Sequence, residues 1–85
     1  MKIYFCDRFD KLHLLAEVPK PVDANELFKV VGTEAKKFCD PRGFTIHYMR
    51  AWVEHRDGVE MTKFDVGSHS EFFYADEVIR EVGGV

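Results

Sequence analysis

Asp57-Gly58 is the feature that most constrains the fold, because this pair stands between two long runs rich in β-forming residues, 44–56 and 59–66. An Asp-Gly pair favours a type I′ turn, which needs a positive φ at both central positions and matches the twist of the strands that it joins. A two-residue turn also sets the register, so that Arg56 opposes Val59 and the other pairs follow in order. The sequence therefore predicts a long antiparallel hairpin in the second half of the chain.

Alternation along these two strands sorts their side chains onto two faces. The face expected to pack against a helix comprises Met49, Ala51, Val53, Phe64 and Val66. The opposite face comprises Tyr48, Arg50, Trp52, Glu54, Met61, Lys63 and Asp65. On this opposite face the register predicts an ion pair between Arg50 and Asp65 and a cation–π contact between Lys63 and Trp52.

The beginning of the chain predicts another hairpin. Residues 2–8 and 12–18 are two further β-rich runs, and the segment between them is short and polar. Pro19 and Pro21 follow the second run, and proline cannot donate a hydrogen bond to a β-ladder. The second strand is therefore expected to end at these prolines.

One helix is expected between the two hairpins. Asp23 is suited to cap its first turn, and Glu26 stands three residues later, as in a capping box. Apolar residues then recur at helical spacing, at Leu27, Val31, Ala35 and Phe38. The Asp-Pro-Arg-Gly sequence at 40–43 is a typical helix end.

The C-terminal part of the chain has two interpretations. In the one that we favour, 71–74 is a short strand and a short helix runs from about Asp76 to Val82. In the other, Ser68 caps a helix with a buried stripe of Phe72, Ala75, Ile79 and Val82.

The elements together predict a single α+β domain over residues 1–85. Its antiparallel sheet consists of two hairpins in the order ββαββ, and one main helix packs on one face of this sheet. A short C-terminal strand and helix complete the fold. One helix covers one sheet face, so the opposite face is either covered by another part of the chain or free for a partner.

Charge and hydropathy exclude several classes of function. The formal net charge is −3, and residues 67–85 hold an acidic excess formed by Glu71, Asp76, Glu77 and Glu81. No Lys/Arg run supplies the basic surface that nucleic-acid binding normally requires. No apolar run is long enough to span a membrane, and the first residues do not resemble a signal peptide. We expect a cytoplasmic protein with reduced cysteines and no membrane or nucleic-acid partner.

Catalytic and metal-binding patterns are weak. The two cysteines and four histidines form no close pair of ligands, so no metal or other cofactor is expected. Asp65, Ser68 and His69 lie within five residues, whereas a catalytic triad needs groups that converge from separate supports. We therefore predict a non-enzymatic protein and keep a small enzyme or metal-binding protein centred on His69 as an alternative.

The aromatic face of the second hairpin is the predicted binding site. Its binding residues are Tyr48, Arg50, Trp52, Lys63 and Met61. Tyr, Trp, Met and Arg are enriched at protein interfaces, and the acidic C-terminal residues form a second candidate surface. The leading hypothesis is a small binding protein for a protein partner. The alternative is self-association as a homodimer, through the same face or through an exposed sheet edge.

The segment FDVGSHSEFF at 64–73 follows the strand–Asp-Gly–strand hairpin. It resembles a segment of small uncharacterised proteins from phages and mobile elements. The resemblance covers the C-terminal part of the chain and carries no activity and no functional residue. It implies a phage- or prophage-type accessory protein that acts inside a bacterium and binds or inhibits a host protein.

Overall fold

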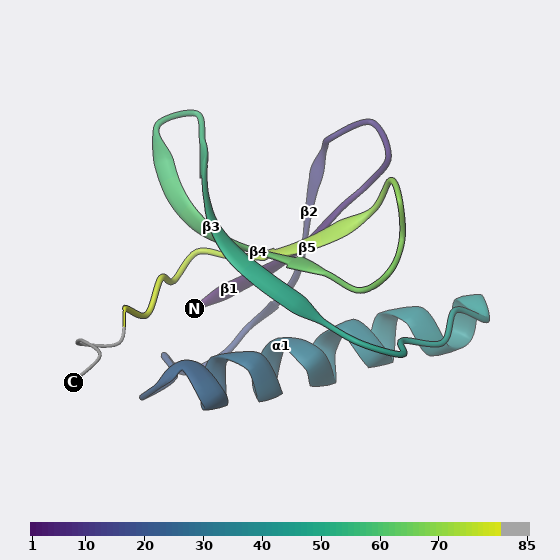
Figure 1. The fold of residues 1–85 in the computed structure, drawn as a ribbon, viewed down its shortest axis with the longest axis horizontal. Helices are drawn as coiled ribbons and strands as arrows, with labels where there is room; N and C mark the ends of the chain where they lie inside the picture. The colour runs from purple at the N-terminus through teal and green to yellow at the C-terminus, as the bar shows by residue number, and fades with distance from the viewer. Residues whose placement is uncertain (81–85) are drawn as a thin grey trace.

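The structure is a computed structural model that describes residues 1–80. Two layers make up the fold, a five-stranded sheet and a helix that lies along one of its faces (Figure 1). The elements in chain order are β1 Lys2–Cys6, β2 Leu12–Glu17, α1 Ala24–Cys39, the short 3₁₀ helix η1 Asp40–Arg42, β3 Arg50–Arg56, β4 Val59–Asp65 and β5 Phe72–Ala75. The predicted α+β class and the ββαββ order are confirmed.

The β3–β4 hairpin has the predicted register throughout, from Arg56 opposite Val59 to Arg50 opposite Asp65. Asp57 and Gly58 both have positive φ, at 49° and 79°, as a type I′ turn requires. The local turn chemistry of one dipeptide thus aligns two seven-residue strands.

The first strand of this hairpin is shorter than predicted. It begins at Arg50, and residues 44–49 form irregular chain. The partner strand stops at Asp65, and Gly67 takes a φ of 97° while its N–H donates to the Asp65 carboxylate at 2.9 Å. Because β4 turns away there, residues 48 and 49 lose the partner that a longer ladder would need.

Helix α1 begins and ends as predicted. The Asp23 carboxylate accepts a hydrogen bond from the Glu26 N–H at 2.8 Å, and the chain leaves the helix through the 3₁₀ turn and Gly43, which has a φ of 74°. The buried residues of the helix are Leu27, Val31, Ala35 and Cys39. These residues pack on the sheet and form one side of the main core.

The C-terminal strand β5 occupies the middle of the sheet. The strand order is β2-β1-β5-β4-β3, and β5 pairs antiparallel with both β1 and β4 (Figure 1). Phe73, Tyr74 and Ala75 are all buried. The predicted strand is confirmed within one residue at each end, and it joins two hairpins that otherwise do not pair with each other.

The predicted helix from Asp76 to Val82 is wrong over its described part, since residues 76–80 contain no helix. Asp76 donates its N–H to the Lys2 carbonyl and accepts the Lys2 N–H on its carboxylate. The Glu77 carbonyl accepts the Thr62 hydroxyl at 2.7 Å. The bond from Thr62 takes a carbonyl that a helix would use for its own hydrogen bonds, and the two bonds with Lys2 hold Asp76 beside β1. Val82 lies outside the described residues.

The alternative helix capped by Ser68 is also wrong, because its predicted stripe begins in strand β5. One further correction concerns Val53, which was expected to pack on α1 but is 41% exposed. The helix contacts β1 and β5 in the middle of the sheet. Strand β3 lies at the edge, where this single helix leaves Val53 uncovered.

Candidate binding surface

The sheet face opposite the helix is partly covered by the turns of the sheet's own two hairpins. Both hairpin turns rise away from the helix (Figure 1), and Arg56 at the end of β3 reaches the β1–β2 turn. Its Nη1 donates to the Asp10 carboxylate at 2.7 Å, and its Nη2 donates to the Asp10 carbonyl at 2.9 Å. A small second core of Cys6, Met61 and Tyr74 lies buried on this face. The centre of the face is therefore closed.

Two of the predicted binding residues belong to this closed region. Met61 is buried in the second core, so it is not part of an accessible surface. The Lys63 side chain is largely buried, with its Nζ 4.1 Å from the centre of the Phe72 ring and 3.4 Å from the Glu54 carboxylate. Its predicted contact with Trp52 is present at 5.9 Å. The Lys63 side chain therefore packs against the aromatic rings, and little of it contacts solvent.

A polar network runs beneath the arginine bridge. The buried Tyr74 hydroxyl donates to the Glu54 carboxylate and accepts from Arg56 at 3.4 Å. The hydrogen bond from Tyr74 lowers the pKa of Glu54, with a smaller contribution from the Lys63 ammonium. Burial and the same hydrogen bond raise the pKa of Tyr74. The phenol therefore stays protonated and donates to an ionised carboxylate.

The predicted ion pair between Arg50 and Asp65 is confirmed, at 2.7 Å. Asp65 is buried, and the hydrogen bond from Arg50 holds its pKa below the ordinary value. The Arg50 guanidinium also lies 5.7 Å from the centre of the Tyr48 ring. Tyr48 in turn packs close to Gly67, where an added Cβ would meet the ring at 3.5 Å. The loop before β3 is thereby held against the turn after β4.

The accessible part of the predicted site is narrower than the sequence indicated. Trp52 is 41% exposed and Tyr48 is 50% exposed, and the Arg50 side chain reaches solvent between them. Val53 is exposed on the other face of the same strand. We call these four residues, together with the side of the strand on which residues 1–80 place no partner, the β3 edge. Its apolar groups lie on both faces of one strand.

The two edges of the sheet differ in how they are protected. Strand β2 carries a register shift opposite the Ile3/Tyr4 step and is soon followed by Pro19 and Pro21. Bulges and prolines are features that prevent edge strands from pairing with other chains. Strand β3 has an unbroken register and no proline. It is the less protected edge.

Charged side chains also commonly protect an edge strand. The three ionic side chains on the open face of β3 all have partners within the molecule: Arg50 with Asp65, Glu54 with Lys63 and Arg56 with Asp10. Because these charges are already compensated, they oppose an approaching strand less than free charges would. The β3 edge therefore combines exposed aromatic groups with unpaired backbone groups and compensated charges.

The predicted acidic surface does not come together. Glu71 precedes β5, whereas Asp76 and Glu77 follow it, so the length of the strand separates them. Asp76 is bonded to the Lys2 backbone, and Glu77 lies 3.7 Å from the Lys20 ammonium. Glu81 lies outside the described residues. The acidic excess is a property of this sequence segment and not of one described surface.

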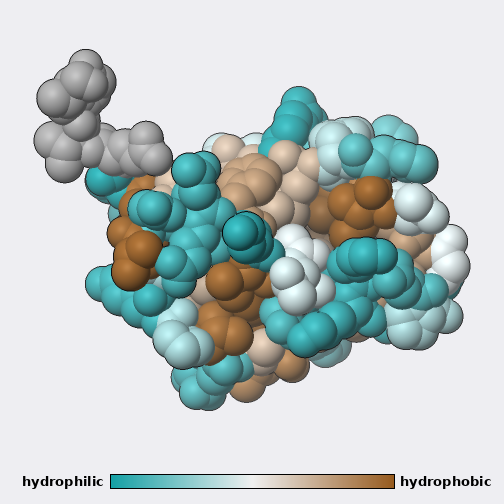
Figure 2. Space-filling view, turned by 90° about the horizontal axis from the view of Figure 1, so that it is seen from below, coloured by the Kyte–Doolittle hydropathy of each residue, from teal (hydrophilic) through white to brown (hydrophobic). Residues whose placement is uncertain are grey.

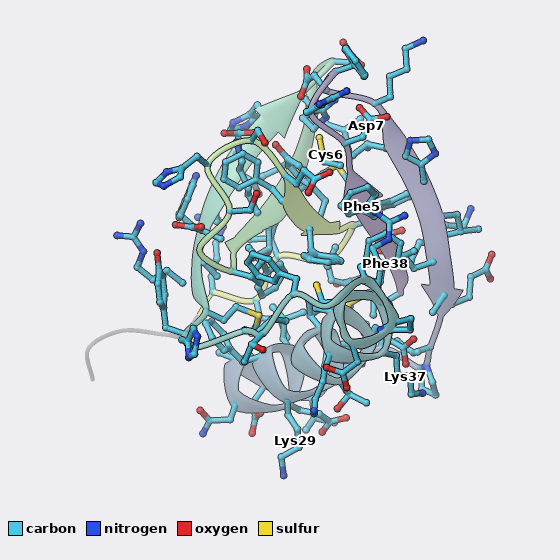
Figure 3. All side chains as sticks on the ribbon, turned by 90° about the vertical axis from the view of Figure 1, so that its right-hand side faces the viewer. Phe5, Cys6, Asp7, Lys29, Lys37 and Phe38 are labelled. Carbon is cyan, nitrogen blue, oxygen red and sulfur yellow. The ribbon has the colours of Figure 1, made fainter. Side chains whose placement is uncertain are left out.

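An apolar pocket lies at the C-terminal end of α1 and was not predicted. It has a volume of about 250 Å³ and is walled by Phe5, Phe38, Phe44 and Phe73. The Phe5 and Phe38 rings lie 4.3 Å apart at this end of the molecule (Figure 3), and Arg42 stacks 4.0 Å from the centre of the Phe38 ring. Four separate segments supply the walls, so no local pattern could have indicated the pocket.

The cysteines are poor candidates for nucleophiles or metal ligands. Burial and a hydrogen bond to Asp10 raise the pKa of Cys6 to about 11, and burial also raises the pKa of Cys39. Both thiols therefore stay neutral at physiological pH, whereas nucleophiles and metal ligands are thiolates. Within residues 1–80 no three Cys, His, Asp or Glu side chains gather as a metal site would need.

His69 is exposed in the loop before β5. Next to it, the Ser68 hydroxyl accepts the N–H groups of Ser70 and Glu71, at 3.4 and 3.2 Å. These bonds are those of a serine that stabilises a turn. Ser68 therefore has a structural role in this segment.

Among residues 1–80, the helix side of the molecule shows no exposed edge strand. Figure 2 views that side, where apolar groups are scattered among polar ones. Along the described chain, no helix has the length and apolar character that crossing a membrane requires. No protein-family model, curated protein or solved structure matches this chain. The β3 edge and its geometry are thus the main guide to function.

Proposed function

We propose that this protein is a small non-enzymatic binding protein that holds a protein partner at the β3 edge. The observation that carries the proposal is the exposure of Trp52 and Tyr48 beside an edge strand whose charged side chains are already paired. Large aromatic groups supply much of the energy of protein interfaces, particularly next to arginine. Arg50 lies between these two residues in the chain, and its guanidinium is 5.7 Å from the centre of the Tyr48 ring.

Strand addition is the binding mode that suits this edge. A partner segment in extended conformation forms main-chain hydrogen bonds with the free side of β3, and its side chains pack beside Trp52 and Val53. The acidic balance of the chain favours a protein partner over a nucleic acid, since phosphate backbones require a basic surface.

The class of partner follows from the resemblance of 64–73 to segments of phage and mobile-element proteins. On that basis the partner is a protein of a bacterial host, which this protein binds or inhibits. A cytoplasmic location belongs to the same proposal.

The test is capture of binding partners by the immobilised full-length protein from bacterial extract, with identification by mass spectrometry. A Tyr48→Ala/Trp52→Ala variant should lose the captured protein, because each interface anchor contributes about 2 kcal/mol or more, roughly a thirtyfold change in affinity. A Phe9→Ala/Val22→Ala variant is the control, since both residues are highly exposed elsewhere. Circular dichroism should show the same fold in all three proteins.

Equal capture by the folded Tyr48→Ala/Trp52→Ala variant would contradict the proposal. Loss of capture in the control variant alone would place the binding surface on another part of the molecule. Self-association is the second candidate function, and the pattern of side chains along β3 favours it specifically.

A further inference from the structure

We propose that the β3 edge pairs with the β3 edge of a second copy of this chain, in an antiparallel two-fold dimer centred on Trp52. This inference rests on the proposed function, because it names one partner of the same edge. Three observations carry it: the direction of the free backbone groups, the order of charges along β3 and the exposure of Trp52 and Val53.

The hairpin turn determines which backbone groups of β3 are free. A two-residue turn makes Arg56 and Val59 a hydrogen-bonded pair, and such pairs alternate along an antiparallel ladder. Residues 50, 52, 54 and 56 therefore direct their N–H and C=O groups toward β4. Ala51, Val53 and His55 direct theirs to the free edge, where the described residues place no neighbouring strand.

In a two-fold antiparallel pair, residues with outward groups must face each other across the interface. Three registers satisfy this condition with extensive overlap of β3, and they place residue 52, 53 or 54 on the two-fold axis. The side chains directly opposite each other differ among these registers, because successive pairs alternate between the two sheet faces.

Charge complementarity favours the register centred on Trp52. Arg50 then lies opposite Glu54 of the second copy, and the reciprocal pair forms by symmetry. The two Trp52 side chains lie opposite each other at a non-hydrogen-bonded position, where facing side chains come closest. On the other face, Val53 packs against Ala51 of the second copy and becomes buried. Aromatic and opposite-charge pairs of this kind stabilise a sheet.

The other two registers place like charges opposite each other. Centred on Val53, the pair brings Arg50 against Arg56 of the second copy, twice. Centred on Glu54, it brings the two Glu54 carboxylates together. Like charges directly opposite are destabilising. The register centred on Val53 has one more hydrogen-bonded pair than the register centred on Trp52, which offsets part of this repulsion. The experiment must therefore distinguish the registers directly.

Sedimentation velocity on the full chain tests whether the dimer exists. We expect a concentration-dependent dimer in the wild type and a monomer for Val53→Pro, because the Val53 N–H points away from β4. The proline removes a donor to the second copy and leaves the hairpin bonds in place. Val53→Ala keeps that donor and should still dimerise. Val53→Lys, which keeps the backbone and adds charge at the interface, should be monomeric if the proline variant fails to fold.

Oxidation of variants that each carry one added cysteine tests the register. Trp52→Cys, Val53→Cys and Glu54→Cys each place a thiol on the axis of one of the three registers, within the Cα separation that a disulfide spans. We expect Trp52→Cys to form a covalent dimer fastest. The wild type is the control, since Cys6 and Cys39 are buried. Faster cross-linking at position 53 or 54 would overturn the proposed register.

A wild type that stays monomeric at its highest soluble concentration would overturn the dimer. The proposed function fails separately, because it depends on capture of another protein through Tyr48 and Trp52. A monomer that still captures that protein would retain the function and reject the dimer. A dimer that forms in the predicted register supports the inference whether or not another protein is captured.

Discussion

At the scale of single residues, Tyr74 shows how the second sheet face is stabilised. Its ring is fully buried, its hydroxyl donates to Glu54, and Arg56 lies 4.9 Å from the ring centre. A buried polar group is costly unless it is hydrogen-bonded, so the phenol, the carboxylate and the guanidinium depend on each other. From the sequence, Tyr74 was predicted only to lie in a short strand.

Tyr74→Phe should therefore destabilise the protein by about 1–3 kcal/mol at neutral pH, because Glu54 loses its donor. The lowered pKa of Glu54 means that its contribution is present above the ordinary value of 4.5 and is lost as pH falls through the folded-state value. The difference between wild type and variant should shrink in acid. Denaturant unfolding at neutral and acidic pH measures it.

Tyr4→Phe is the matched control for this prediction, since the Tyr4 hydroxyl makes no hydrogen bond among residues 1–80. It should change stability little at either pH. An equal loss in the two variants would show that the Tyr74 network contributes nothing specific.

At the scale of the elements, two glycines have opposite roles. Gly58 needs its φ of 79° for the turn that aligns β3 with β4. Gly32 lies within α1, where an added Cβ would meet the Met49 methyl group at 3.6 Å, an ordinary contact distance. Position 32 therefore has room for an added methyl group.

Substitution by alanine should give effects of opposite sign. Gly58→Ala should destabilise by about 1 kcal/mol or more, since an L-residue is strained at this φ. Gly32→Ala should stabilise by about 0.4–1 kcal/mol, because it removes backbone freedom from the unfolded chain. Thermal unfolding of the two variants beside the wild type measures both. Destabilisation by Gly32→Ala would mean that the contact with Met49 is tighter than the structure indicates.

At the scale of the whole molecule, β5 connects the parts. It pairs with one strand of each hairpin and contributes Phe73 to the core between sheet and helix. The Phe73 ring lies 5.6 Å from that of Phe5 and 5.9 Å from that of Phe38. A domain of this size has a small core, so one such residue carries much of the stability.

Phe73→Ala should cost about 3–5 kcal/mol, a large fraction of the total stability of a small domain. Phe9→Ala makes the same chemical change at a residue that is 70% exposed, and it should have little effect. Chemical denaturation compares the two variants. Similar losses would contradict the central role of β5.

The sequence by itself determined the features that depend on near neighbours. The Asp57-Gly58 turn set the register of β3 and β4, and Asp23 with the apolar spacing set the bounds of α1. From that register followed the contacts of Arg50 with Asp65 and of Lys63 with Trp52. Local backbone preferences and side-chain periodicity suffice for such features, because the interacting groups are adjacent along one element or across one turn.

Only the tertiary structure decided how the elements meet. It placed β5 in the middle of the sheet, held residues 76–80 outside a helix and closed the second face through Arg56 and Asp10. For the same reason Met61 became buried and Val53 exposed. These outcomes depend on contacts between residues far apart in the chain, which no local pattern encodes. They reduced the accessible part of the predicted aromatic face to the β3 edge.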